Sequence, residues 1–230
     1  MEFLEHTVYD SQMPMNENKS KFDLSIAYGK LRKHFGPQHW WPGETPFEIS
    51  VGAILTQNTN WSNVEKAIAN LKSAKVMSPR KLYAVPEKKL AALIRPSGYF
   101  NVKAKRLRAF LALLCEKYHG SLRRLFKLEF DALREELLGV NGIGEETADS
   151  IILYAAGKPT FVIDAYTRRI FSRHGMCDRK ARYSELKLIF ESHLKPDARL
   201  YNEYHALIVR LGKEFCRARA PLCIECPLQE

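Results

Sequence analysis

A glycine-rich turn lies past the middle of the chain, where residues 138–149 read Leu138-Gly139-Val140-Asn141-Gly142-Ile143-Gly144-Glu145-Glu146-Thr147-Ala148-Asp149. Gly142 and Gly144 are one residue apart, and glycine tolerates the positive φ angles that tight turns need. The pattern predicts a helix that ends near Leu138, a hairpin, and a second helix that starts near Glu145. Such a turn directs backbone N–H groups outward, where they can bind a phosphate. An ordinary helix connection with glycines has the same pattern, so the turn alone does not decide between the two.

A second feature is an aspartate at a predicted helix start. The apolar run 161–163 leads into Asp164, and a helix is predicted from Ala165 to His174. The simplest interpretation of Asp164 is an N-cap, whose side chain accepts hydrogen bonds from free N–H groups of the first turn. A functional role is compatible with the cap, because a capping carboxylate is fixed in place and held in its ionised form.

The rest of the chain predicts an all-α fold. From Phe22 onward, short amphipathic stretches are broken by Gly, Pro and Asn, and no period-two alternation is long enough to require a sheet. Residues 1–20 are polar and aperiodic, and we expect a mobile tail there. The expected helices cover residues 23–34, 46–57, 61–73, 78–84, 87–94, 102–118, 130–138, 145–156, 165–174, 183–193 and 199–215.

The charge balance favours a polyanionic partner. The 230 residues include 36 Lys and Arg against 26 Asp and Glu, for a net charge of +10, and nucleic acid is the default partner of so basic a chain. No uncharged apolar run approaches the roughly 18 residues that would span a bilayer. The first residues also lack the pattern of a signal peptide. We therefore expect a cytoplasmic protein without membrane contact, associated with the nucleoid if the source is prokaryotic.

Three of the five cysteines crowd the C-terminus, at Cys216, Cys223 and Cys226. In a reducing compartment such a cluster indicates a metal site rather than disulfides.

The turn, the aspartate and the cysteine cluster occur in an order that resembles the helix-hairpin-helix DNA glycosylases of the endonuclease III superfamily. The resemblance covers about residues 22–230. It implies a two-domain all-α fold, with a six-helix domain at about 47–155 that contains the hairpin at 138–149. The second domain would combine residues 21–46 with residues 156–230. The DNA groove and the base pocket would lie between the two.

The resemblance also implies residue roles for a monomeric enzyme that binds double-stranded DNA containing a damaged base. Gln57 would enter the duplex where the flipped base leaves a space, although on its own it reads as a surface amide that caps a helix. The hairpin would hold the DNA backbone. Its DNA-binding residues would be Asn141, Gly142, Ile143, Gly144, Glu145 and Thr147.

The chemistry of this family suits two carboxylates of the chain. Cleavage of an N-glycosidic bond leaves an oxocarbenium-like sugar, and Asp164 is the candidate carboxylate that stabilises its charge. Bifunctional members of the family carry a catalytic Lys in the hairpin helix, and the matching position here is Glu146. A carboxylate cannot form an imine, so the strand-cleaving step loses its nucleophile. Lys158 is a nearby amine without further support.

The three tryptophans of the chain point to the substrate. Trp40, Trp41 and Pro42, followed by Trp61, resemble the 3-methyladenine glycosylase III branch, in which aromatics at the Trp40 and Trp61 positions sandwich the extrahelical base. By base rate, tryptophans are more often core residues. An aromatic sandwich would favour a cationic alkylated purine through stacking and cation–π attraction.

The cysteine cluster reproduces the first three ligands of the family's iron-sulfur loop, C-x6-C-x2-C-x5-C, whose fourth ligand would fall at position 232. We expect a 4Fe-4S cluster held by Cys216, Cys223 and Cys226. A zinc ion that recruits a histidine such as His205 is the chemical alternative, and a site without metal is another, since the 3-methyladenine branch lacks a cluster.

These observations favour a monofunctional DNA glycosylase of base excision repair that hydrolyses the bond to an alkylated purine such as 3-methyladenine. The first alternative is a bifunctional endonuclease III-type glycosylase and AP lyase for oxidised pyrimidines. The second is a non-catalytic helix-hairpin-helix DNA-binding protein.

Overall fold

The computed structural model describes residues 23–40 and 43–229. Every regular element within these ranges is helical, so the predicted all-α class is confirmed. None of the helices in the described ranges has the length and apolar character needed to cross a bilayer. The α-helices are α1 (Leu24–Phe35), α2 (Pro46–Leu55), α3 (Trp61–Ser73), α4 (Pro79–Tyr83), α5 (Glu87–Leu93), α6 (Phe100–Ala112), α7 (Leu122–Leu125), α8 (Phe130–Leu138), α9 (Glu145–Ser150), α10 (Ala165–Arg173), α11 (Tyr183–His193) and α12 (Ala198–Glu214).

Three short irregular helices complete the described fold. One 3-10 turn, η1 (Arg95–Ser97), precedes α6. Two π-helical turns, η2 (Leu113–Lys117) and η3 (Ile151–Ala155), continue α6 and α9. The helices expected at 102–118 and 145–156 therefore each consist of an α part and a wider π part. The short elements η1 and α7 were not predicted.

Local capping explains where several helices begin. The Asp23 side chain accepts from two backbone N–H groups of the first turn of α1. Thr45 accepts from the backbone N–H of Glu48 at the start of α2, where Pro46 follows the cap. Asp197 caps α12 in the same way as Asp23 caps α1. Each cap satisfies N–H groups that have no partner inside the helix.

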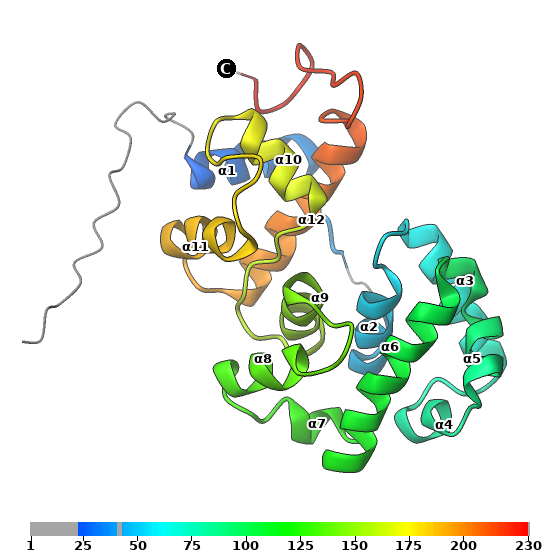
Figure 1. The fold of residues 1–230 in the computed structure, drawn as a ribbon. Helices are drawn as coiled ribbons and strands as arrows, with labels where there is room; N and C mark the ends of the chain where they lie inside the picture. The colour runs from blue at the N-terminus through cyan, green and yellow to red at the C-terminus, as the bar shows by residue number, and fades with distance from the viewer. Residues whose placement is uncertain (1–22, 41–42, 230) are drawn as a thin grey trace, which may run out of the picture.

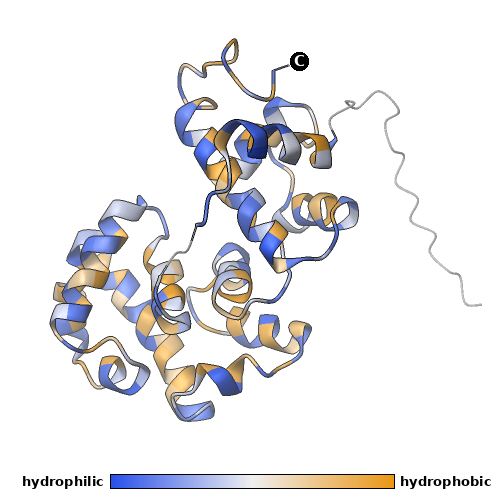
Figure 2. Cartoon of the chain, turned by 180° about the vertical axis from the view of Figure 1, so that it is seen from behind, coloured by the Kyte–Doolittle hydropathy of each residue, from blue (hydrophilic) through white to orange (hydrophobic). Residues whose placement is uncertain are grey.

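The buried residues form two clusters. One extends from Phe47 to Ile152 and fills the space among α2–α9. The other combines Leu24, Ala27 and Leu31 of α1 with buried residues from Leu153 to Leu228 and Ile49 of α2. Figure 1 shows α1 and α10–α12 gathered on one side of the molecule and α2–α8 on the other. Hydrophobic and hydrophilic residues alternate around the helices of both parts (Figure 2), as expected for amphipathic helices around a core.

The domain limits 47–155, 21–46 and 156–230 stay a prediction. The chain passes between the two clusters through η3, which packs against both α2 and α12. The expected tail at residues 1–20, with Trp41 and Pro42, lies outside the described residues.

A buried lysine fixes the end of α2, from which the site is built. The Lys103 ammonium donates to the carbonyl oxygens of Leu55 at 2.8 Å and Ser97 at 2.6 Å. Burial, together with the charge of Arg106, lowers the pKa of Lys103 to about 8. The lysine thus satisfies a carbonyl at the C-terminus of α2, two residues before Gln57.

Candidate active site

A cavity of about 760 Å³ lies between the two clusters. Its walls come from the ends of α2 and α3, from α9 and η3, from the start of α10 and from the middle of α12. Among the lining residues are Trp40, Trp61, Glu146, Asp164 and His205. The volume is in the range of small-molecule sites, which are concave and carry a few convergent polar groups.

Asp164 is the N-cap of α10, as its position in the sequence predicts. Its Oδ1 accepts hydrogen bonds from the backbone N–H of Thr167 at 2.7 Å and from Thr167 Oγ1 at 2.9 Å. Its Oδ2 lies 3.6 Å from Nε2 of His205, which is an ion-pair distance rather than a hydrogen bond. One oxygen of Asp164 therefore serves the helix, and the other faces the cavity and the histidine.

The surroundings of Asp164 favour its ionised form. Burial by itself would raise the pKa of the carboxyl, but the charge of His205 when protonated and the two hydrogen bonds from Thr167 outweigh it. The pKa of Asp164 lies below its ordinary value as a result. Asp164 can thus present a negative charge to the cavity across the neutral pH range.

His205 was not expected near Asp164. The imidazole is buried on the inner face of α12, and its Nδ1 lies 2.7 Å from the hydroxyl of Tyr154 in η3. Its ring stacks on Trp40, with centroids 5.8 Å apart and 26° between the planes. The only sequence signal was a histidine at the helical spacing of buried residues such as Tyr201, which on its own indicates packing.

Glu146 lies in the first turn of α9 and lines the same cavity. The residue as a whole is exposed, while its carboxyl lies among the groups that line the cavity. Burial of the carboxyl, together with the negative charge of Asp164, raises the pKa of Glu146 to about 7, against an opposing influence of His205 and Arg168. Two carboxyl groups therefore share the cavity with pKa values displaced in opposite directions, an arrangement typical of acid–base sites.

Gln57 is held against the hairpin in this structure. Its amide nitrogen donates to the carbonyl oxygen of Gly142 at 3.0 Å and to Thr147 Oγ1 at 2.9 Å. Its amide oxygen accepts from the guanidinium of Arg106. Gln57 thus stands at the mouth of the cavity beside the hairpin, and it does not cap α2 by itself.

The hairpin uses its two glycines differently. Gly142 has φ +87°, and a Cβ there would lie 2.2 Å from Cγ of Arg106. Gly144 is extended, with φ −95° and ψ −179°, and a Cβ there would meet nothing within 4 Å. The positive φ predicted for the turn therefore belongs to Gly142, whereas Gly144 leaves an open approach to the start of α9.

The remaining predicted DNA-binding residues divide into exposed and internal ones. Asn141 is exposed, whereas the Ile143 side chain is 5% exposed and packs in the first cluster. Glu145 pairs with Arg134 at 3.2 Å, and Thr147 is buried beneath Gln57. A DNA contact by Ile143 or Gly144 would therefore use the backbone.

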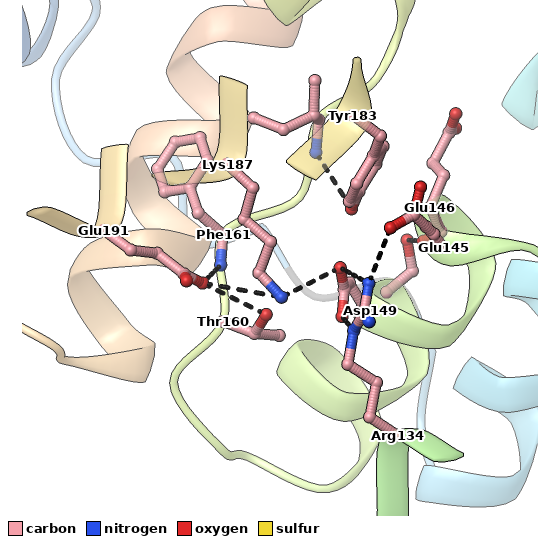
Figure 3. Close-up of polar contacts among 11 residues, drawn as sticks. Arg134, Glu145, Glu146, Asp149, Thr160, Phe161, Tyr183, Lys187 and Glu191 are labelled. Atoms are coloured by element: carbon pink, nitrogen blue, oxygen red, sulfur yellow. Dashed lines mark hydrogen bonds and ion pairs between the residues drawn. The ribbon is translucent and has the colours of Figure 1, made fainter. Parts of the chain in front are cut away.

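A buried ionic network joins the two sides of the cavity (Figure 3). Asp149 of α9 has no exposed surface, and its carboxylate lies 2.9 Å from Nε of Arg134 in α8 and 3.1 Å from Nζ of Lys187 in α11. Lys187 lies 3.8 Å from Glu191, which accepts from the backbone N–H of Phe161 at 2.8 Å. The network links the helix that carries Glu146 to the segment that leads to Asp164.

The two tryptophans in the described residues both line the cavity. Trp61 begins α3 and lies on α2 at Gly52, where a Cβ would come within 3.2 Å of its ring. Trp40 contacts Tyr154 edge-on as well as His205. Both rings are partly buried, so packing and base contact are compatible roles for them.

Comparison with known proteins identifies the family. The model of the HhH-GPD superfamily, base excision DNA repair proteins, matches residues 51–196. The chain belongs to this superfamily. The HhH-GPD fold, the enzyme class of DNA N-glycosylase and a role in DNA repair follow from that membership, as the sequence predicts.

Individual relatives agree with this assignment. A candidate DNA repair glycosylase of Methanocaldococcus jannaschii is 50% identical over 94% of this chain and 98% of its own length. The endonuclease III of Thermotoga maritima is 31% identical over 80% of this chain and 81% of its own length. A crystal structure of the H. pylori 3-methyladenine DNA glycosylase bound to 1,N6-ethenoadenine superimposes with a TM-score of 0.72 at 30% identity. The superposition covers 84% of this chain and 98% of the H. pylori chain.

The C-terminal cysteines of this HhH-GPD protein do not form a ligand set within the described residues. Cys216 is buried, Cys226 is half-buried and Cys223 is exposed. Arg173 donates to the sulfur of Cys216 at 3.3 Å. No three His, Cys, Asp or Glu side chains in residues 23–40 and 43–229 are placed to hold a metal ion. A 4Fe-4S cluster is held by four thiolates, of which Cys216, Cys223 and Cys226 would supply three, and we derive no catalytic step from it.

The zinc alternative with His205 is wrong. His205 lies beside Asp164 and Tyr154 in the cavity, and its Nδ1 is occupied by the tyrosine hydroxyl. It lies on α12 nine residues before the last helical residue, Glu214, or about 14 Å along a helix axis at 1.5 Å per residue, and Cys216 follows the end of that helix. His205 therefore belongs to the active-site cavity.

Proposed function

We propose that the protein is a monofunctional DNA glycosylase that excises alkylated purines, 3-methyladenine among them, from double-stranded DNA. The observation that carries the proposal is the cavity itself, in which two carboxyl groups, Glu146 and Asp164, face a space bordered by Trp40 and Trp61. A purine methylated at N3 or N7 carries a formal positive charge. Aromatic faces and carboxylates both attract a cation.

The charge of such a base also explains why the site needs little acid catalysis. A cationic purine leaves as a neutral base when the C1′–N bond breaks and its electron pair moves to the ring. The sugar then becomes oxocarbenium-like, and the negative Oδ2 of Asp164 stabilises it. Water adds to C1′ and releases a proton to solvent, which completes the hydrolysis.

The same site lacks the amine of a lyase at the expected place. Glu146 occupies the position in the hairpin helix, and Lys158 is half-buried and absent from the cavity walls. Of the lysines in the described residues, Lys213 of α12 alone lines the cavity. We therefore propose that the product is an intact strand with an abasic site.

The H. pylori neighbour supports the substrate class, since that protein is a 3-methyladenine DNA glycosylase bound to a modified adenine. The relation to endonuclease III of Thermotoga maritima makes oxidised pyrimidines the competing class. DNA as the partner is supported by the net charge of +10 and by the family.

A panel of duplexes tests the proposal. Methylated, deaminated and oxidised duplexes are incubated with the protein, and released bases are identified by mass spectrometry, with Asp164→Asn as the inactive control. We expect release of 3-methyladenine or 7-methylguanine and strands that stay uncut until heat or alkali is applied. Release of oxidised pyrimidines alone would support the endonuclease III type, and binding without any release would support a non-catalytic protein.

Borohydride reduction tests the monofunctional assignment separately. We expect no covalent complex with abasic DNA from the wild type or from Glu146→Gln. A trapped wild-type complex would contradict the assignment, and Lys213→Gln would then show whether Lys213 supplies the amine.

The 4Fe-4S cluster stays a proposal for Cys216, Cys223 and Cys226, independent of catalysis. Iron and acid-labile sulfide in protein purified without oxygen are the measurements that decide it. Protein free of both would leave a site without iron.

A further inference from the structure

One buried polar atom of the active site has no hydrogen-bond partner in the part of the chain that the structure describes. Among the described residues, Nε2 of His205 is the buried side-chain nitrogen or oxygen without a hydrogen bond. The residue is 4% exposed, and a buried polar group without a hydrogen bond destabilises the fold. Such an atom in a native fold therefore calls for an explanation, and this one faces the cavity 3.6 Å from Oδ2 of Asp164.

Tyr154 and Asp164 together favour one position of the ring proton. Burial, and then the negative charges of Asp164 and Glu146, raise the pKa of the Tyr154 hydroxyl well above its ordinary value, so the group stays protonated. A neutral imidazole has one nitrogen that accepts and one that donates. When the Tyr154 hydroxyl donates to Nδ1 at 2.7 Å, the ring proton is on Nε2 and faces the carboxylate. The opposite tautomer would place a lone pair against a negative charge.

We infer that His205, oriented by Tyr154, is a positioning residue that holds Asp164 ionised and aimed at the sugar when a flipped nucleotide fills the cavity. The inference rests on the glycosylase activity, whichever base is removed. A nucleotide that enters the cavity displaces the water around Oδ2, and a carboxylate without a donor would then take up a proton. A small movement of the ring brings Nε2–H into hydrogen-bond range of Oδ2.

A histidine, whose Nε2–H can donate even from a neutral ring, suits this reaction better than a permanent cation. A lysine or arginine beside Oδ2 would also hold the carboxylate, but its positive charge would oppose the oxocarbenium-like sugar and a cationic base. The stacking of His205 on Trp40 restricts the ring to one plane, which supports an orienting role.

Other charged groups around His205 and Asp164 come from several elements, and they are unchanged in every variant of the test. Glu146 faces the pair from α9, Arg168 of α10 acts on Glu146 through its charge, and Tyr183 and Lys213 line the cavity from α11 and α12. An effect seen only in variants of His205 and Tyr154 can therefore be attributed to the contact between His205 and Asp164.

The test compares His205→Leu, His205→Gln and Tyr154→Phe in the full chain. The glutamine amide nitrogen can occupy the place of Nε2 and donate to Oδ2, whereas leucine cannot. The carboxyl carbon of Asp164 is followed by NMR against pH in labelled protein without DNA, and its signal is identified by its loss in Asp164→Asn. We expect the midpoint to rise by about one pH unit or more in His205→Leu, by less than half as much in His205→Gln, and by an intermediate amount in Tyr154→Phe.

Base release under single-turnover conditions gives the second readout. The acid limb of the pH profile should move upward by the same amounts, with duplex affinity within about threefold of the wild type. His193→Leu, at an exposed histidine of α11, is the matched control and should change neither measurement.

The inference is overturned if His205→Leu leaves the Asp164 midpoint unchanged, or if leucine and glutamine shift it equally. If the leucine variant does not fold, Tyr154→Phe takes its place in the comparison. The Asp164 midpoint should then rise more in Tyr154→Phe than in His205→Gln, and equal shifts or no shift would overturn the inference. The NMR titration needs no substrate, so a wild type that fails to release alkylated purines would contradict the proposed substrate and leave this test intact.

Discussion

At the scale of single residues, the site depends on two carboxyl groups whose pKa values are displaced in opposite directions. Thr167 and His205 hold the pKa of Asp164 low, while burial and the charge of Asp164 raise that of Glu146 to about 7. One group is therefore anionic at neutral pH, and the other is close to its midpoint. A catalytic pair with distinct roles requires this separation.

Asp164→Asn separates the charge of this residue from its structural role. The amide oxygen can still accept the bonds from Thr167 that cap α10, so folding should be nearly unchanged. We expect base release to fall by about 100- to 1000-fold, the usual loss when one charge-stabilising group is removed. Single-turnover kinetics with an alkylated duplex measure the loss, and binding should stay within a few-fold. Turnover near the wild-type rate would remove Asp164 from the mechanism.

Glu146 should make the pH dependence differ with the charge of the base. As pH rises through about 7, its carboxyl loses its proton, and the resulting anion attracts a cationic purine. A neutral modified base such as 1,N6-ethenoadenine instead benefits from a proton donor, which is present below that pH. Release of a cationic base should therefore rise through pH 7 and release of a neutral base should fall. Glu146→Gln should abolish both steps, and parallel profiles for the two bases in the wild type would contradict this role.

At the scale of elements, local sequence signals predicted most helices, and tertiary contacts decided the rest. The helices at 61–73, 130–138 and 183–193 have the expected limits, because apolar spacing and caps are properties of neighbouring residues. The π turns of η2 and η3 have no such signal.

The contacts of the active site were also only partly predictable from the local sequence. The N-cap position of Asp164 is readable in the sequence, but a histidine or lysine on a helix face does not reveal its partner. His205 meets Tyr154, and Lys187 meets Asp149, only after distant segments pack together.

The hairpin provides a prediction with a built-in control. Gly142→Ala forces a side chain into a positive φ and against Arg106, and should lower the free energy of unfolding by about 1 to 2 kcal/mol. Gly144→Ala meets no atom within 4 Å, so its stability should stay near wild type. Because its new methyl lies at the open start of α9, duplex affinity should still fall. Urea unfolding and a fluorescence binding assay separate the two effects, and equal stability losses would contradict the assignment.

At the scale of the whole molecule, the two hydrophobic clusters meet around a cavity, and a buried ionic network joins them beside it. Asp149 belongs to the side of α9, and Lys187 extends from α11 on the other side. Buried ion pairs add little net stability compared with apolar packing, but they fix geometry when both partners are present. The network is therefore suited to hold the distance between Glu146 and Asp164.

A double-mutant cycle measures this coupling. Asp149→Asn leaves Arg134 and Lys187 without their shared counter-charge, at a cost of about 3 kcal/mol in unfolding free energy. Lys187→Met alone should cost less, because Arg134 still pairs with Asp149. If the pair acts as a unit, the double variant should lose about 1 kcal/mol less than the two single losses together.

Lys117→Met is the matched control, because Lys117 forms an exposed pair with Glu136 away from the cavity, and it should leave stability nearly unchanged. Urea unfolding measures the free energies of the cycle. The pH at which the rate of base release changes, set by Glu146, shows whether the network influences the active site. Lys187→Met should change that pH, because it frees α9 to shift Glu146 relative to Asp164, whereas Lys117→Met should leave it in place. If the losses in unfolding free energy are additive and the pH dependence of base release does not change in Lys187→Met, the network stabilises the fold without setting the spacing of the two carboxyl groups.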